Sequence, residues 1–204
     1  VGASAQAEAV IRQLDAHPDL RRLARNPFLL SLLCGISHHA KAVSAVAPLS
    51  RTALYRRAIE LIVAHHNRCF PRPITPLEEH KIEQFALWLL SDAPNAPRYV
   101  FDRTDVQQCL NETTTLDHIQ AARLLSQLHL DRESFHFLHT TFQEYLAARG
   151  LSNDSSAAAR LPARTYDMGW QEVLCFAAGA SANANSNIVF RQILWQQLAA
   201  LAQQ

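Results

Sequence analysis

The fold is decided by residues 128–139, which read LHLDRESFHFLH. Apolar and polar residues alternate there with a period of two, which indicates β-strands, whereas the preceding segments carry the spacing of helices. Two strands, 128–131 and 135–139, joined by a turn at 132–134, would form a hairpin. Helices followed by such a two-stranded wing are the order of a winged-helix domain.

Elsewhere the sequence favours helices, with one further short strand expected at 99–101. Only 5 of the 204 residues are glycine, where average usage gives roughly 14. Three pairs fit the capping box at a helix start, namely Thr75–Glu78, Thr140–Gln143 and Thr141–Glu144. The predicted helices run over 5–17, from 18 onward, 28–35, 50–69, 75–91, 102–110, 117–128, 140–149, 168–178 and 187–202.

The side-chain pattern also predicts what these helices bury. The helix over 28–35 is apolar on nearly every side, so we expect it to be buried all round. The apolar stripe of the helix over 50–69 is predicted to pass through Leu54, Ala58, Leu61, Ile62 and His65. Gly150 suits the C′ position that ends a helix. The four cysteines lie in helical contexts and are predicted to be buried, reduced thiols.

The fold class follows from this order of elements. We expect a mainly α protein, in which a helical bundle and a winged-helix domain with one β-hairpin precede the start of a helical array. The predicted domains are residues 1–49, 50–155 and 156–204, with 40–49 as a connecting loop.

Composition excludes several functions for this chain. The two lysines, Lys41 and Lys81, do not follow a glycine, so there is no G-x-x-x-x-G-K-[ST] phosphate loop, and no G-x-G-x-x-G occurs either. A net charge of +1 argues against a dedicated nucleic-acid binder, and no apolar run reaches the ~18 residues of a membrane span. No Ser/His/Asp set or acid pair suggests an enzyme. The start at Val1 shows no signal peptide and reads as an excerpt of a longer protein.

Two stretches carry a family resemblance: NPFLLSLLC at 26–34 and FHFLHTTFQEYLAA at 135–148. Together they resemble the region just downstream of the nucleotide-binding core in NACHT proteins, the branch of the STAND signalling ATPases that includes NOD-like receptors. RTALY at 51–55 resembles the family's linker into its winged helix, and GWQEVL at 169–174 resembles the first helix beyond it.

The resemblance implies a regulatory role. Residues 1–49 would be the tail of helical domain 1 and 156–204 the first helices of helical domain 2. Pro27 would pack near the adenine of ADP, and His139 would reach its phosphates and lock the resting state. ADP or ATP with Mg²⁺ would be held mainly by an upstream nucleotide-binding domain in cis. Exchange for ATP would allow self-oligomerisation and signalling in the cytoplasm, in immune or anti-phage defence.

The residues alone leave the role of His139 open. It precedes a helix N-terminus, whose N–H groups and partial positive charge suit phosphate, and it can donate a hydrogen bond to an anion. It shares one face of the predicted strand with Phe135 and Phe137, so we expect it to point towards whatever these phenylalanines cover. It could equally finish a hairpin and bond to backbone. Pro27 likewise suits the first position of any helix.

Two other functions remain open from the sequence. A winged helix can bind DNA or serve as a scaffold, but the helix over 117–128 offers only Arg123 for reading bases. The i, i+4 pairs Cys34/His38 and His65/Cys69 have the spacing to hold a zinc ion together, which would make the chain a zinc-stabilised helical adaptor.

Overall fold

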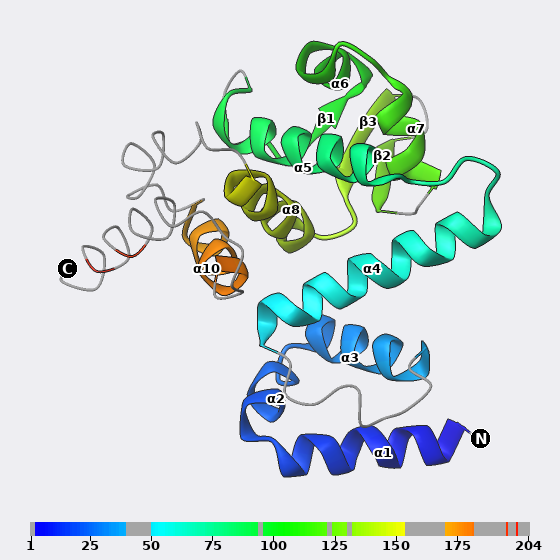
Figure 1. The fold of residues 1–204 in the computed structure, drawn as a ribbon, viewed down its shortest axis with the longest axis vertical. Helices are drawn as coiled ribbons and strands as arrows, with labels where there is room; N and C mark the ends of the chain where they lie inside the picture. Colours follow the sequence, from blue (N-terminus) through cyan, green and yellow to red (C-terminus); the bar gives the residue numbers. More distant parts are fainter. Residues whose placement is uncertain are drawn as a thin grey trace. The chain divides into compact units, whose positions relative to one another are not determined.

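The computed structural model describes residues 3–39, 50–93, 96–121, 124–129, 132–153 and 170–181, together with 195 and 199. The fold is mainly helical, with one small antiparallel sheet (Figure 1). It divides into two compact units, Val1–His65 and His66–Gln204, and the division lies within one helix. The predicted loop at 40–49 and the predicted last helix at 187–202 lie outside the described residues, apart from 195 and 199.

The described residues of the first unit form three helices and most of a fourth. These are α1 (Ala3–Ala16), α2 (Pro18–Leu23), α3 (Pro27–His39) and α4 (Arg51–Cys69), which continues into the second unit. Asn26 Oδ1 accepts hydrogen bonds from the backbone N–H groups of Phe28 at 2.9 Å and Leu29 at 3.3 Å. This cap and Pro27 at the first helical position start α3 as the sequence predicts.

Burial in this unit differs from the prediction in two helices. In α3, Leu29, Leu33 and Ile36 are buried, but Phe28, Leu30 and Leu32 are only partly so, and the expectation of burial on every side is wrong. In α4 the buried positions are Leu54, Tyr55, Ala58, Ile59, Val63 and His66. His65 is exposed. When an apolar stripe is wide, the sequence does not show which residues at its edges are buried, because the neighbouring helices decide which edge they cover.

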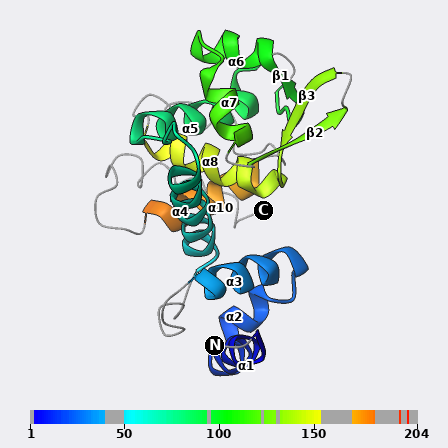
Figure 2. The same cartoon turned by 90° about the vertical axis from the view of Figure 1, so that its right-hand side faces the viewer.

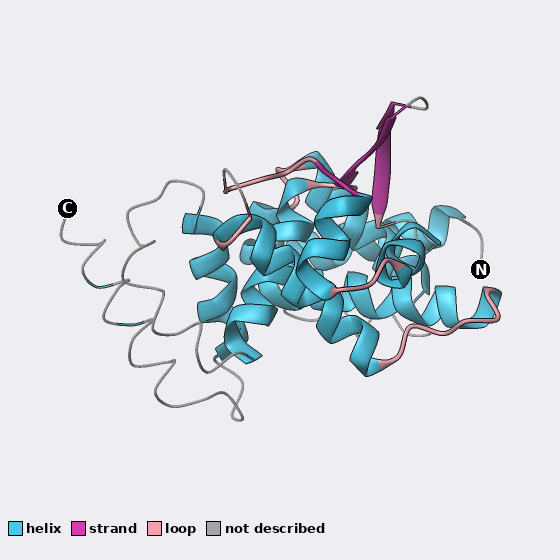
Figure 3. Cartoon of the chain, turned by 90° about the horizontal axis from the view of Figure 1, so that it is seen from above, coloured by secondary structure: helices cyan, strands magenta, loops and turns pink. Residues whose placement is uncertain are grey.

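In the second unit, the end of α4 is followed by helices and a small sheet. The order is α5 (Pro76–Ser91), β1 (Phe101–Asp102), α6 (Arg103–Leu110), α7 (Thr114–Ala121), β2 (Leu125–His129) and β3 (Arg132–Phe137). The strands form an antiparallel sheet in the order β1-β3-β2, with Phe101 opposite Phe135 and Leu125 opposite Phe137. Figures 2 and 3 show the β2–β3 hairpin projecting from the helices of its unit.

The hairpin is confirmed, but its bounds are not those predicted. The predicted helix over 117–128 starts earlier, at Thr114, and ends at Ala121, and residues 125–128 lie in β2. Residues 132–134, predicted as the turn, belong to β3. The expected strand at 99–101 is displaced to 101–102, where it adds a third strand to the sheet.

An aromatic cluster joins this sheet to α5. The ring of Phe101 lies edge-on to Phe85 at 5.0 Å between centroids, and 5.7 Å from Phe137. Phe135 is also close, at 6.3 Å. All four side chains are almost fully buried. Such aromatic pairs add about 0.5–1.5 kcal/mol beyond their buried area, so the alternating phenylalanines of β3 fix the sheet on the helices.

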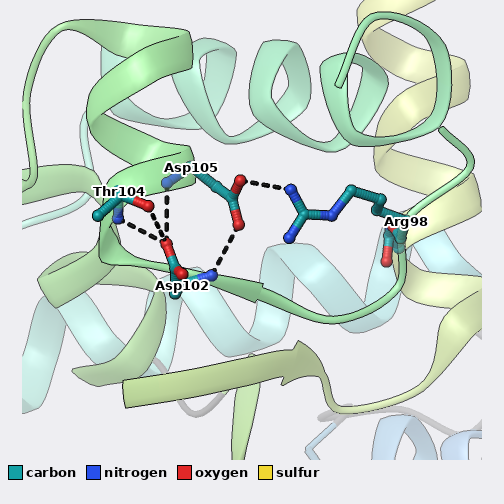
Figure 4. Close-up of polar contacts among 5 residues, drawn as sticks. Arg98, Asp102, Thr104 and Asp105 are labelled. Atoms are coloured by element: carbon teal, nitrogen blue, oxygen red, sulfur yellow. Dashed lines mark hydrogen bonds and ion pairs between the residues drawn. The ribbon is translucent and has the colours of Figure 1, made fainter. Parts of the chain in front are cut away.

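A polar cluster fixes the start of α6 next to this core (Figure 4). Asp102 Oδ1 accepts from the backbone N–H groups of Thr104 at 2.8 Å and Asp105 at 3.1 Å, and Asp105 Oδ2 accepts from the Asp102 N–H at 2.9 Å. Arg98 pairs with the other carboxylate oxygen of Asp105 at 2.5 Å. Burial raises the pKa of Asp102, but these hydrogen bonds outweigh it and hold the pKa below its usual value. The cluster therefore caps the start of α6.

Helix α8 (Thr140–Asn153) lies between α5 and α10 (Gln171–Ser181), and most of its residues are buried (Figure 1). The ring of Tyr145 in α8 contacts the ring of Phe176 in α10 edge-on, with 5.5 Å between the ring centroids. Gly150 is inside the helix and has no left-handed backbone, so the prediction that it ends the helix is wrong. A Cβ at this position would lie 2.7 Å from the backbone oxygen of Glu83 in α5. The glycine is therefore required by close helix packing.

Gly150→Ala is expected to destabilise the second unit. Overpacking against backbone costs about 1–3 kcal/mol, which exceeds the gain of roughly 1 kcal/mol from the better helix propensity of alanine. Gly35→Ala in α3 is the matched control, because nothing lies within 4 Å of its added Cβ, and it should stabilise the first unit. Urea unfolding followed by circular dichroism measures both. A stabilising Gly150→Ala would show that α5 and α8 do not approach so closely.

A second polar cluster joins α5 to the start of α7. Glu112 accepts from the hydroxyls of Thr114 at 2.6 Å and Thr115 at 2.5 Å, and from Lys81 Nζ at 2.9 Å. These hydrogen bonds, with the Lys81 charge, lower the pKa of Glu112 to about 2. The preceding residue, Asn111, adopts a left-handed conformation with φ 55° and ends α6.

Glu112→Gln is expected to reduce the acid sensitivity of the second unit. The pKa of Glu112 is lowered from 4.5 to about 2 in the folded state. Its contribution to the free energy of unfolding is therefore present above pH 4.5 and is lost as the pH falls towards 2. Wild type should therefore lose more stability than the variant over that range. Urea midpoints measured at pH 2.5 and 6 test this. An equal loss in both proteins would mean that solvent screens the cluster completely.

All four cysteines are thiols, but Cys34, Cys69 and Cys175 are exposed and only Cys109 is partly buried. The expectation of buried thiols is thus wrong for three of them. Burial raises the pKa of Cys109 to about 12, so it is a thiol and not a thiolate at neutral pH. Within the described ranges, no helix has the length and apolar character needed to cross a bilayer.

Candidate functional site

His139 lies in the short connection between β3 and α8. Strand β3 ends at Phe137 and α8 begins at Thr140. Phe135 and Phe137 point into the core, with 3% and 2% of their surface exposed, whereas His139 is only partly buried. The strand alternation therefore stops before His139, and the expectation that it continues the phenylalanine face is wrong. The residue instead belongs to the start of α8.

The ring of His139 is held by the first turn of α8. Its Nδ1 accepts a hydrogen bond from the backbone N–H of Thr141 at 3.2 Å and lies 2.8 Å from the Thr141 hydroxyl oxygen. The His139 carbonyl also accepts from the N–H of Phe142 at 2.9 Å. His139 thus acts as the N-cap of α8, with an imidazole nitrogen in place of the usual side-chain oxygen.

This cap determines which ring nitrogen carries the proton. A nitrogen that accepts a hydrogen bond has a free lone pair, so the neutral imidazole of His139 is assigned the proton on Nε2. The Nε2–H lies on the side of the ring away from Nδ1 and Thr141. A donor orientated in this way can bind an anionic oxygen without first taking up a proton.

The helix behind His139 is fixed to the rest of the unit by buried polar contacts. Gln143, 1% exposed, donates its side-chain N–H to the backbone oxygen of Arg98 at 2.7 Å. Glu144 is buried as well. Because Gln143 bonds elsewhere and Thr141 lies inside the helix, the capping boxes predicted for Thr140–Gln143 and Thr141–Glu144 are wrong. These side chains position the helix, and through it His139.

A buried ion pair holds the far end of the same helix. Arg149 Nε donates to one carboxylate oxygen of Glu83 at 2.9 Å, and Asn153 donates to the other at 2.9 Å. The Glu83 side chain is 2% exposed, and His80 lies 3.9 Å from it. Burial raises the pKa of Glu83 even though Arg149 acts to lower it. The sequence indicated none of this, because a Glu within an apolar helix face has no local signal for a partner on another helix.

Pro27, the other predicted site residue, begins α3 in the first unit and is exposed. Its ring is presented at a helix start that Asn26 caps. His139 lies in the second unit. The assignment of both residues to a nucleotide stays a prediction.

The zinc alternative receives no geometric support in the described part of the chain. There, no group of three or more His, Cys, Asp or Glu side chains lies close enough to hold a metal ion. Comparison with protein-family models and with curated proteins found no match to this chain.

Proposed function

We propose that this chain is the regulatory lid of a NACHT-type STAND ATPase switch. It would close over ADP bound to an upstream nucleotide-binding domain and move when ATP replaces ADP. Two features support the proposal: the sequence strings at 26–34 and 135–148, and the helix and strand order of a winged helix between α5 and β3. Without a phosphate loop, this chain would contribute contacts but no hydrolysis, and the parent protein would be the ATPase.

The observation that carries the proposal is the hydrogen bond from the Thr141 N–H to His139 Nδ1. It assigns the proton of the neutral ring to Nε2, on a residue between the end of β3 at Phe137 and the start of α8, a helix whose residues are mostly buried. Such a donor suits a phosphate oxygen of ADP, which would accept the hydrogen bond. Pro27 would add an apolar contact to the adenine.

The switch would work through different contacts in its two states. In the ADP state His139 would bond to phosphate and hold the lid closed, and the ATP state would lack this contact. A ligand shifts such an equilibrium only by its difference in affinity for the two states. Opening would expose surfaces for self-oligomerisation, in a cytoplasmic signalling or defence protein.

The winged-helix DNA-binding alternative is less well supported. The helix that would enter the major groove, α7, contains no lysine or arginine. Asp117 of α7 pairs with Arg103 of the neighbouring helix α6 at 3.3 Å, so the charge of this arginine is already compensated within the protein. Affinity for DNA depends mainly on cations that contact phosphates, so a scaffold role is the better form of this alternative.

Calorimetric titration of the chain with ADP and ATP tests whether it is only the lid. We expect no binding in the micromolar range, because one histidine and one proline cannot replace the phosphate loop that holds the β-phosphate and Mg²⁺. Micromolar binding by the chain alone would contradict the lid proposal, since the nucleotide site would then be complete within it.

A further inference from the structure

A cavity of about 260 Å³ lies at the corner between α1 and α2 in the first unit. His17 forms the corner with an extended backbone, φ −129° and ψ 98°, and α2 restarts at Pro18. The cavity is lined by Leu14, Asp15, Pro18, Arg21, Arg22 and Arg25. Three arginines, one aspartate and two apolar residues therefore line one small space.

These arginines are not equivalent. Arg21 pairs with Asp15 at 2.5 Å, so the charges of these two side chains compensate each other. Arg22 and Arg25 form no ion pair with any residue that the structure describes. The lining thus carries a net charge of +2, from Arg22 and Arg25.

The surrounding sequence has the same sign. Residues 1–65 contain eight Lys and Arg against four Asp and Glu, whereas residues 66–204 contain eleven against fourteen. A positive unit attracts anions and concentrates them near its surface. The apolar atoms of Leu14 and Pro18 reduce the local dielectric constant, which strengthens the interaction of an anion with the guanidinium groups.

The size and charge of the cavity indicate a phosphate group. Its volume is below the roughly 300–1,000 Å³ of pockets that hold a drug-sized ligand, so it suits a head group and not a whole nucleotide. A phosphate monoester carries about −1.5 to −2 charges at neutral pH and has three acceptor oxygens. That matches two unpaired guanidinium groups, each able to donate two parallel hydrogen bonds. A carboxylate would neutralise only one of them.

We propose that the α1–α2 cavity binds a phosphate group, held by Arg22 and Arg25. The shared chemistry is the phosphate dianion, either as inorganic phosphate or as the monoester of a small molecule. Arg21 stays paired with Asp15 and defines one side of the site. The site is separate from His139 and does not depend on the lid proposal.

Calorimetric titration of the whole chain with inorganic phosphate and with phenyl phosphate, at constant ionic strength near 0.15 M, tests the site. We expect saturable, one-to-one binding, with phenyl phosphate bound more tightly if the ligand is a monoester and inorganic phosphate at least as tightly if it is free phosphate. Arg22→Gln with Arg25→Gln should weaken binding by at least about tenfold, since hydrogen bonds to charged groups are lost. Absence of saturable binding of both probes would overturn the proposal.

Two further variants separate a specific site from general charge. Arg56→Gln with Arg57→Gln removes the same charge from exposed positions of α4, and it should leave binding unchanged within about twofold. Equal weakening by both double variants would overturn the proposal. Asp15→Asn should tighten binding, because it removes the negative charge and releases Arg21, and misfolding cannot produce a gain. Failure of Asp15→Asn to tighten binding would also count against the site.

Discussion

Arg149→Ala should destabilise the second unit by about 3–5 kcal/mol, the usual cost of leaving a buried charge without its partner. The Glu83 carboxylate is 2% exposed and accepts a hydrogen bond from Arg149 at 2.9 Å. After this truncation Asn153 still donates a hydrogen bond to the carboxylate, but the positive charge beside it is gone. At the neighbouring Gly150 the backbones of α8 and α5 already approach closely, which leaves little room for the helices to move together and compensate.

Urea unfolding followed by tryptophan fluorescence measures this effect in the second unit alone, because all three tryptophans lie within residues 66–204. Arg103→Ala is the matched control, since its pair with Asp117 is 37% and 58% exposed and such surface pairs contribute about 0–1 kcal/mol. Adding Glu83→Gln to Arg149→Ala should recover part of the stability, because the buried charge is then gone. Equal effects of the two arginine variants would contradict this account.

The cost of Arg149→Ala should also depend on pH. Burial raises the pKa of Glu83 above its ordinary 4.5, and removing Arg149, which lowers it, raises it further. A carboxyl group whose pKa is raised in the folded state stabilises the fold fully below pH 4.5, its unfolded pKa. This stabilisation is lost as the pH rises through the folded pKa. The difference from wild type should therefore be larger at pH 8 than at pH 4. His80 and Glu79 also face Glu83, but both are present in the two proteins compared.

Local features of the fold were predictable from sequence, because their partners are a few residues apart. Thr75 and Glu78 form both hydrogen bonds of the predicted capping box, and Asn26 caps the helix that Pro27 begins. The hairpin was also recognisable from the alternation in β3. Its exact register was not, because β2 starts at Leu125 through pairing with Phe137 across the sheet, which overrides a helical spacing that continues to Leu128.

Features that depend on distant partners could not be predicted. Glu83 is stabilised by Arg149 and Asn153, far along the chain, and Gln143 bonds to the backbone of Arg98. The prediction that Gly150 ends a helix is wrong for the same reason: a glycine is required there because the backbone of Glu83 in α5 lies too close for a Cβ. For His139, the sequence indicated the position before a helix, but not the Thr141 contact that assigns its proton to Nε2.

Loss of the His139 imidazole should shift the proposed switch towards its open state by roughly 10- to 150-fold. A hydrogen bond to a charged group contributes about 1.5–3 kcal/mol, and about 1.4 kcal/mol corresponds to tenfold. A switch that rests a few percent open would then be substantially open without its trigger. His139→Ala also removes the cap of α8, which costs about 0.5–2 kcal/mol of stability.

His139→Asn separates these two effects. Asparagine is among the best N-cap residues, so it can accept from the Thr141 N–H and keep α8 intact, but it lacks the imidazole Nε2–H. His136→Asn is the control, because that histidine lies one residue before Phe137 in β3 and bonds to the Phe137 carbonyl at 2.7 Å. We expect unchanged helicity in both variants and an altered switch only in His139→Asn.

The most direct test is the ADP content and oligomer size of the full-length protein carrying His139→Asn, beside wild type and His136→Asn, without the trigger. The account predicts that wild type and His136→Asn retain ADP and stay monomeric, whereas His139→Asn loses ADP and forms oligomers. A folded His139→Asn protein that keeps its ADP and remains monomeric would contradict the account, and would leave His139 as the N-cap of α8 alone.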